Sequence, residues 1–442
     1  MTKTPTERRP LGLVSVALLS FFSVCGGPFG SEQIVSACGP LVGLTSLLLF
    51  PLVYSLPLNL LLAELCSAFP IDSSFCTWVG LAFGRSWGFY VGYWSWLAST
   101  FDAAVYPCLV TASLFMNMDT SWEMKTLVRI ALLTLFMIPT LFSINFVGKA
   151  SVWLAVVVLV PFVVLIVTAV PQMNFHHVLA IGPEMDWTQL ISLLFWNFRG
   201  FDAMGAYAGE IHNPQANFHR AMLLSLFMIS ATYMLPLLAA AAVNKPNYTT
   251  WTDGEFPTIA QFIGGAWLAR WVAISNGVSS FGLYFVESTA NGFRLTGMAD
   301  IGFAPRWFML RDEATGCPRR SILFIYGLGV AMCAVDFSTI LGVTNALSIL
   351  AQLVQSCAGI SLRYTHADIQ RPYRVNLDKS ALAAVMALPI ALGVAIFVNQ
   401  LCVNSITVFL TGGAIIIGVV FRFSMQLQEK GYERIAKEND IS

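Results

Sequence analysis

Twelve long apolar stretches constrain this chain more than any other feature of its sequence. A membrane-crossing helix needs about 20 mostly apolar residues. Stretches of that kind lie near 11–38, 42–69, 87–115, 127–145, 151–170, 190–210, 219–243, 267–292, 321–340, 342–363, 382–400 and 404–424. Of the 442 residues, 57% are hydrophobic and only 11% are charged, whereas soluble proteins carry about 25% charged residues. We therefore expect an all-α polytopic membrane protein with twelve transmembrane helices in a lipid bilayer.

The basic residues predict the orientation of the chain. Cytoplasmic loops of membrane proteins carry an excess of Lys and Arg. With a cytoplasmic N-terminus, the external loops hold only four of the 24 Lys and Arg, namely Lys125, Arg129, Lys245 and Arg270, and Arg199 falls inside the membrane. We expect both termini on the cytoplasmic side, with cytoplasmic tails at 1–10 and 425–442, in the plasma membrane.

Two of the apolar stretches contain residues that a continuous helix tolerates poorly. The first is interrupted by Gly26-Gly27-Pro28-Phe29-Gly30, and the sixth by Asn197 to Asp202, which includes an Arg, a Gly and an Asp. Proline lacks the amide donor and glycine raises the backbone entropy. Breaks five spans apart are typical of two inverted five-helix repeats with the substrate at their interface. The alternative is that Gly and Pro are simply frequent in membrane helices.

This spacing predicts a first repeat at 11–170, a second at 190–363, and two added helices at 382–424. At bilayer depth, an unwound backbone is tolerated only where it lines a protein-enclosed cavity. We therefore expect the two breaks to meet at a binding site.

Several motifs together resemble one superfamily of transporters. They are Gly26 to Gly30 with Glu32, Ser55-Leu56-Pro57, Ala63-Glu64-Leu65, Trp96-Leu97 with Asp102 and Tyr106-Pro107, Phe195-Trp196-Asn197 with Asp202, Ala208-Gly209-Glu210, Asn213-Pro214, Glu287, Leu295 to Ala299, and Arg371 to Arg374. Their order resembles the amino acid–polyamine–organocation superfamily, and within it the polyamine uptake transporters of plants and kinetoplastids. The resemblance implies a LeuT-like fold with broken helices 1 and 6. The chain departs from the polyamine branch at Arg199 and Gly200, where that branch has an Asn and a bulky aromatic, and at Ala103, where an Asn is expected.

Ionisable side chains inside a membrane are costly, about 2.5–3.5 kcal/mol on insertion scales, and are usually functional. A polyamine needs carboxylates for its ammonium groups and aromatic walls for its methylene stem. An amino acid instead needs backbone groups at the breaks for its carboxylate and ammonium. Our candidate substrate-binding residues are Gly26, Gly27, Phe29, Gly30, Asp102, Tyr106, Trp196, Asn197, Arg199, Gly200, Tyr284 and Glu287.

Other roles are open for several of the acids. Glu64 and Glu210 lie near span ends and suit packing or a gate ion pair. Glu32 opens the second half of the first broken span, where it caps a helix dipole or takes part in coupling. Asp102 either binds substrate or neutralises Arg199. We choose Asp202 and Glu32 as proton-coupling candidates, because burial brings a carboxylic acid into the pH range where it can exchange protons.

The sequence also excludes several classes of function. It has no GxxxxGK[ST] motif for ATP, and no nucleophile–base pair for an enzyme. Its nine cysteines include no CxxC, its five histidines form no cluster, and its net charge of zero gives no surface for nucleic acid. We expect no metal and no cofactor. An ion gradient or exchange then drives the transport, and the intramembrane acids favour protons over sodium.

The sequence therefore predicts a proton-coupled uptake carrier for polyamines, such as putrescine and spermidine, or related cationic amino compounds. One alternative is an amino acid permease in which Arg199 offsets the acids. The other is a receptor that uses a transporter fold without transport.

Overall fold

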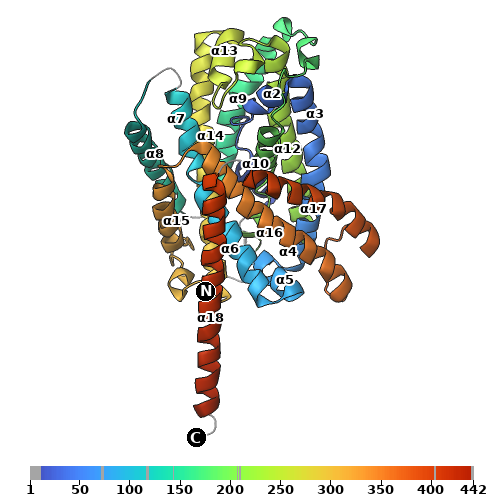
Figure 1. Ribbon diagram of the computed structural model, residues 1–442, viewed down its shortest axis with the longest axis vertical. Helices are drawn as coiled ribbons and strands as arrows, with labels where there is room; N and C mark the ends of the chain where they lie inside the picture. The colour runs from blue at the N-terminus through green and yellow to red at the C-terminus, as the bar shows by residue number, and fades with distance from the viewer. Residues whose placement is uncertain are drawn as a thin grey trace.

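The computed structural model describes residues 11–70, 74–115, 119–142, 144–206, 208, 211–402 and 405–439. This part of the chain is mostly helical, and it contains no β-strand beyond one isolated bridge between Leu11 and Ile211. The helices pack as an elongated bundle, from which the C-terminal part of the last helix projects (Figure 1). The N-terminal tail 1–10 and Glu210 lie outside the described residues.

The first half of the bundle is built from the helices up to residue 172. They are α1 (Leu13–Val24), α2 (Glu32–Cys38), α3 (Pro40–Phe50), the π-helical turn η2 (Pro51–Ser55), α4 (Leu56–Ala68), α5 (Ser74–Phe83), α6 (Arg85–Asp102), α7 (Val105–Leu114), α8 (Trp122–Met137), η3 (Ile138–Leu141), α9 (Ile144–Ala169) and η4 (Val170–Gln172). The turns η3 and η4 are 3₁₀ helices. The short helix α5 was not expected from the sequence.

The second half follows after the 3₁₀ turn η5 (His177–Leu179). Its elements are α10 (Trp187–Phe198), α11 (Ala203–Ala206), α12 (Pro214–Val243), η7 (Tyr248–Thr250), α13 (Phe256–Gly264), α14 (Ala266–Asp300), η8 (Arg306–Met309), α15 (Arg319–Met332), α16 (Phe337–Thr365), α17 (Lys379–Leu401) and α18 (Ser405–Asn439). The helix α13 was also not expected. It lies at one end of the bundle with α2, and α5 lies at the other end (Figure 1).

Seven helical segments of the described chain are long and apolar enough to cross a membrane. They are Pro40–Ala68, Trp122–Leu141, Phe146–Gln172, Gln215–Val243, Phe337–Thr365, Lys379–Leu401 and Ser405–Gln426. The expected spans near 11–38, 87–115 and 190–210 are each divided into two shorter helices. The two remaining expected spans lie in α14 and α15. Helix α14 is less apolar because it carries buried polar groups such as Asn276, Asn291 and Arg294, and α15 is short, with 14 residues.

The boundary between α15 and α16 differs from the sequence-based one. We expected the ninth span to reach residue 340, whereas α15 ends at Met332 and α16 begins at Phe337. The Asp336 side chain accepts a hydrogen bond from the Thr339 amide at 2.9 Å. This N-cap satisfies an otherwise unpaired amide in the first turn and starts α16 earlier than its apolar run.

Two helical interruptions lie against each other inside the bundle. The first separates α1 from α2, and the second separates α10 from α11. Helix α1 contacts α11, and α2 contacts α10. The first half of one broken segment therefore meets the second half of the other, so the two segments run in opposite directions.

Glycine is required where the interruptions touch. Gly200 has a φ of 105°, and a Cβ atom there would lie 2.3 Å from the Ser23 carbonyl oxygen. At Gly26, with a φ of 62°, a Cβ atom would lie 2.4 Å from the Leu283 side chain. Both positions need the left-handed freedom and the small volume of glycine.

Candidate functional site

Glu287 lies in the middle of α14 with only 5% of its surface exposed. Its Oε2 atom accepts a hydrogen bond from the Tyr106 hydroxyl on α7. No Lys, Arg or His side chain in the described part of the chain lies within ion-pair distance of this carboxylate. Glu287 is thus a buried acid held by a neutral donor, which leaves it capacity to bind a cation.

Arg199 and Asp102 form an ion pair beside Glu287. The Arg199 Nη2 atom lies 2.6 Å from Asp102 Oδ1, and both side chains are 5% exposed. Arg199 also donates from Nη1 to the Ser348 hydroxyl at 3.3 Å. Asp102 accepts a further hydrogen bond from Trp196 Nε1 at 3.3 Å, and its Oδ2 atom lies 3.2 Å from the Tyr106 hydroxyl oxygen. The structure therefore places Arg199, which follows α10, against Asp102 at the end of α6.

A small closed cavity lies between these residues and the first interruption. Its lining residues are Ser23, Val24, Cys25, Asp102, Tyr106, Trp196, Arg199 and Leu283, and its volume is about 10 Å³. Gly30 lies directly against the Trp196 ring, since a Cβ atom at Gly30 would be 2.7 Å from it. All of these lining residues are buried, so the cavity is closed in this conformation.

The structure does not bring all of the candidate residues to this cavity. Phe29 packs its ring against Phe162 and Phe256, at centroid distances of 5.1 and 6.0 Å. Tyr284 packs near Phe136, 6.0 Å between centroids. Asn197 donates back to the Leu193 carbonyl of its own helix at 2.9 Å. Gly26, Gly27 and Gly200 shape the two interruptions through their backbones, with φ values of 62°, 150° and 105°.

Asp202 occupies a separate polar site beyond the second interruption. Its Oδ2 atom accepts a hydrogen bond from the Ser95 hydroxyl at 2.8 Å and lies 3.5 Å from Arg294 Nη2. The Arg294 side chain is only 1% exposed. It donates to the Ser95 carbonyl at 3.0 Å and to the Ser99 hydroxyl at 2.9 Å. A guanidinium buried in the bundle needs such acceptors, and helical spacing alone did not reveal them.

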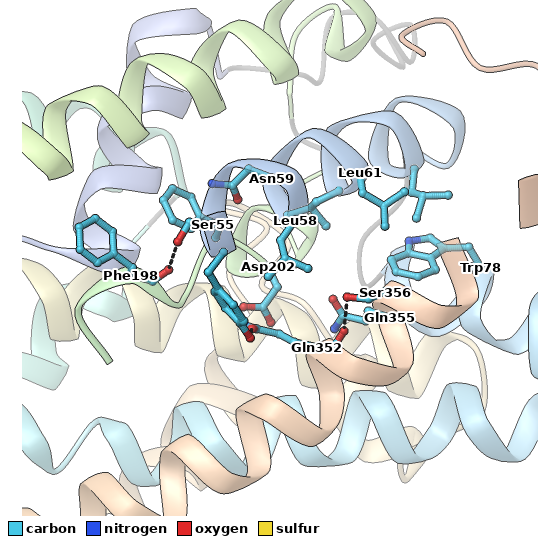
Figure 2. A pocket seen from close by; sticks show the side chains of 14 residues that line it. Ser55, Leu58, Asn59, Leu61, Trp78, Phe198, Asp202, Gln352, Gln355 and Ser356 are labelled. Atoms are coloured by element: carbon cyan, nitrogen blue, oxygen red, sulfur yellow. Dashed lines mark hydrogen bonds between the residues drawn. The ribbon is translucent and has the colours of Figure 1, made fainter. Parts of the chain in front are cut away.

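Asp202 also lines a cavity of about 40 Å³ (Figure 2). The same cavity is lined by Asn59, Trp78 and Gln355, whose side-chain N–H groups have no hydrogen-bond partner among the described residues. Ser55 and Phe198 also line this cavity, and the Ser55 hydroxyl donates a hydrogen bond to the Phe198 carbonyl at 3.3 Å. A cavity of this size has room for water molecules that would satisfy these donors.

Glu32 lies apart from both sites. It is fully buried at the start of α2, where Oε1 accepts from the Phe256 amide at 3.4 Å. Nearby, Asp253 lines two larger cavities of about 390 and 410 Å³, both of which also reach Gln33. The Asp253 Oδ1 atom is shielded from solvent, and burial raises the pKa of Asp253 to about 6.

Glu64 is the centre of an ion-pair cluster at the other end of the bundle. It accepts hydrogen bonds from Arg363 Nε at 2.7 Å and from the Val375 amide at 2.9 Å, and it lies 3.1 Å from Arg371 Nε. The cluster ties α4 to α16 and to the loop after it. This geometry fits the packing role that the sequence analysis left open for Glu64.

The comparison with protein families identifies the chain. The model of the amino acid permease family matches residues 11–421. The chain belongs to the amino acid permease family. The resemblance to the amino acid–polyamine–organocation superfamily is thereby confirmed, and the permease is a multi-pass membrane transporter, not an enzyme.

Individual relatives agree with this family. The permease is 32% identical to a probable polyamine transporter of Arabidopsis thaliana, over 98% of its own length and 91% of the relative. It is 30% identical to a polyamine transporter of Oryza sativa, over 96% and 80% of the two chains. A more distant relative, 22% identical over 76% of each chain, is a probable agmatine/putrescine antiporter of Lactococcus lactis.

Proposed function

We propose that this permease is a secondary active transporter that takes up small cationic amino compounds, the class to which the polyamines belong. The observation that carries this proposal is the buried Glu287 carboxylate, which is held by Tyr106 beside the two helical interruptions. A carboxylate left without a basic partner at that depth is expensive unless a cation binds it during the transport cycle. The names of the plant relatives point to the same class of substrate.

We propose that the transporter has twelve spans arranged as two inverted five-helix repeats, 11–170 and 190–363, with 382–424 added, in a LeuT-like fold. The opposite courses of the two interrupted segments support this arrangement. Alternating access would then move the two repeats around the site between the interruptions. Both termini would be cytoplasmic, and the plasma membrane is the proposed location.

We further propose that protons drive the uptake, with Asp202 as the coupling acid and Glu32 as a second candidate. Asp202 is 16% exposed, more than the neighbouring Arg294 at 1%, and it lines the cavity with room for water. Its distance of 3.5 Å to Arg294 Nη2 is longer than the 2.6 Å between Arg199 and Asp102. Glu32 is buried with one oxygen that has no hydrogen-bond partner among the described residues.

A second candidate, an amino acid permease, is favoured by the presence of Arg199 in the closed cavity. A guanidinium repels a polyamine and attracts a carboxylate. Uptake of radiolabelled putrescine, spermidine, arginine and leucine into cells or proteoliposomes separates the candidates. Saturable, acid-stimulated uptake of the cationic compounds supports the proposal. Saturable uptake of leucine alone, or no flux of any compound, contradicts it.

A further inference from the structure

The closed cavity carries one more negative than positive charge when the groups around it are counted. Asp102, which lines the cavity, and Glu287, which accepts a hydrogen bond from the lining residue Tyr106, are the carboxylates, and Arg199 is the guanidinium group. Arg199 pairs with Asp102, and Glu287 has no ion-pair partner among the described residues. A substrate with a net charge of plus one balances this site, whereas a diamine brings twice that charge.

Arg199 has a donor that the protein does not use. Its Nη2 atom pairs with Asp102 and its Nη1 atom donates to Ser348. The residue is only 6% exposed. Its Nε atom is shielded from solvent and has no hydrogen-bond partner among the described residues. An unused buried guanidinium donor costs free energy, and a carboxylate is the group that satisfies it best.

Asp102 and Ser348 hold Arg199 from two sides, and Trp196 borders the same cavity. The guanidinium is therefore a fixed cation in the site and not a side chain that reaches solvent. Its positive charge occupies the position beside Asp102 where the second ammonium group of a diamine would otherwise bind. Arg199 is therefore one of the two cations that Asp102 and Glu287 can bind together.

We propose that the site binds basic α-amino acids, with Arg199 facing the substrate carboxylate and Glu287 facing an ammonium group, and that Arg199 disfavours the corresponding decarboxylated diamines. This inference rests on the proposed function, since it requires that Glu287 binds a substrate cation. Such an amino acid has two cationic groups and one carboxylate, so its net charge matches the site.

Ornithine and putrescine test the proposal directly, because they share the carbon stem and both amino groups and differ only in the carboxylate. Their affinities are measured by competition for uptake and by thermal shift of the purified full-length transporter. In the wild type, we expect ornithine to bind about tenfold or more tightly than putrescine, the size of effect that one charge-assisted contact gives. Tighter binding of putrescine overturns the inference.

Variants of Arg199 assign the preference to this residue. Arg199→Gln removes the cation and releases Asp102, so ornithine should bind about tenfold or more weakly and putrescine should bind more tightly. Arg199→Lys keeps the charge and should keep the order of affinities. A preference for ornithine that is unchanged in Arg199→Gln overturns the inference.

A double variant protects the test against misfolding, because Arg199→Gln alone leaves Asp102 buried without its partner. Asp102→Asn with Arg199→Gln removes both charges. It should lose the advantage of ornithine over putrescine and keep binding that depends on Glu287. Retention of the ornithine advantage overturns the role of Arg199. If the wild type binds neither ornithine nor putrescine, the proposed function is contradicted. This outcome is distinct from a changed order of affinities, which contradicts only the inference about Arg199.

Discussion

Tyr106 on α7 and Glu287 on α14 share a hydrogen bond in the interior of the bundle, with the tyrosine hydroxyl as the donor. The same hydroxyl lies 3.2 Å from Asp102 Oδ2. A tyrosine has one proton to donate, so it fully satisfies only one of these carboxylates at a time. Since Arg199 already neutralises Asp102, we propose Glu287 as the acid that is available to a substrate.

The first prediction concerns Glu287→Gln, which keeps the size of the side chain and removes its charge. We expect substrate affinity to fall about tenfold to a hundredfold, because a hydrogen bond to a charged group contributes roughly 1.5–3 kcal/mol. Saturation uptake of the preferred cationic substrate measures the change. Tyr106→Phe is the control, since it removes only the neutral donor and should weaken affinity less. Unchanged affinity at normal surface expression in Glu287→Gln would remove this residue from the substrate site.

Asp202→Asn should separate coupling from binding. Loss of the titratable group should abolish the stimulation of uptake by external acid, while exchange of labelled for unlabelled substrate continues. Ser95→Ala removes the hydrogen bond to Asp202 Oδ2 and keeps the acid, so it should retain acid stimulation. Equal loss of uptake and exchange in Asp202→Asn would assign the residue to binding or folding instead.

Glu64→Gln should destabilise the protein strongly. The carboxylate is 1% exposed and faces two guanidinium groups, those of Arg363 and Arg371. Removing one partner of a buried ion pair costs about 3–5 kcal/mol. The matched control is Asp300→Asn, because Asp300 pairs with Arg311 at 3.0 Å on the surface, where the two side chains are 40% and 31% exposed. Exposed pairs contribute about 0–1 kcal/mol. Similar melting temperatures of both variants in detergent would contradict the buried cluster.

Gly200→Ala should disturb the contact between the two interruptions. A Cβ atom there meets the Ser23 carbonyl at 2.3 Å, on a backbone with a φ of 105°. We expect lower thermal stability and impaired transport. In Gly277→Ala the new methyl group meets nothing within 4 Å on the helix α14, so this change should be neutral or slightly stabilising. Wild-type behaviour of Gly200→Ala would mean that the two interruptions are not in contact.

The raised pKa of Asp253 predicts that the stability of the protein depends on pH. Burial raises its pKa to about 6, whereas an unfolded Asp titrates near pH 3.9. Between these values the folded protein holds a proton that the unfolded chain has lost, so the contribution of Asp253 to stability falls as the pH rises through this window. Asp253→Asn cannot ionise. Its melting temperature relative to the wild type should therefore increase from about pH 4 to about pH 6 and then level off.

Asp312→Asn provides a control of opposite sign. Hydrogen bonds from Thr315 lower the pKa of Asp312, so this carboxylate stabilises the folded protein at neutral pH and loses that effect as the pH falls. The loss of stability in Asp312→Asn should shrink in acid. Parallel melting curves of the wild type and Asp253→Asn across the pH range would contradict the raised pKa of Asp253.

The sequence by itself determined that the chain is a helical membrane protein and which family it resembles. Apolar stretches of membrane length and the scarcity of charge have few other solutions. The positions of the two interruptions also followed from the sequence, because Gly26 to Gly30 and Arg199 to Asp202 cannot continue a helix comfortably at bilayer depth. The rare acids in the apolar stretches were visible for the same reason.

Only the tertiary structure decided which of these charges meet. Asp102 pairs with Arg199, Asp202 approaches Arg294, and Glu287 is left with Tyr106. Phe29 and Tyr284 are equally suitable residue types, yet they pack elsewhere. The physical reason is that a pairing depends on the rotation and depth of one helix against another. Hydrophobic periodicity does not define these in spans that are apolar around much of their circumference.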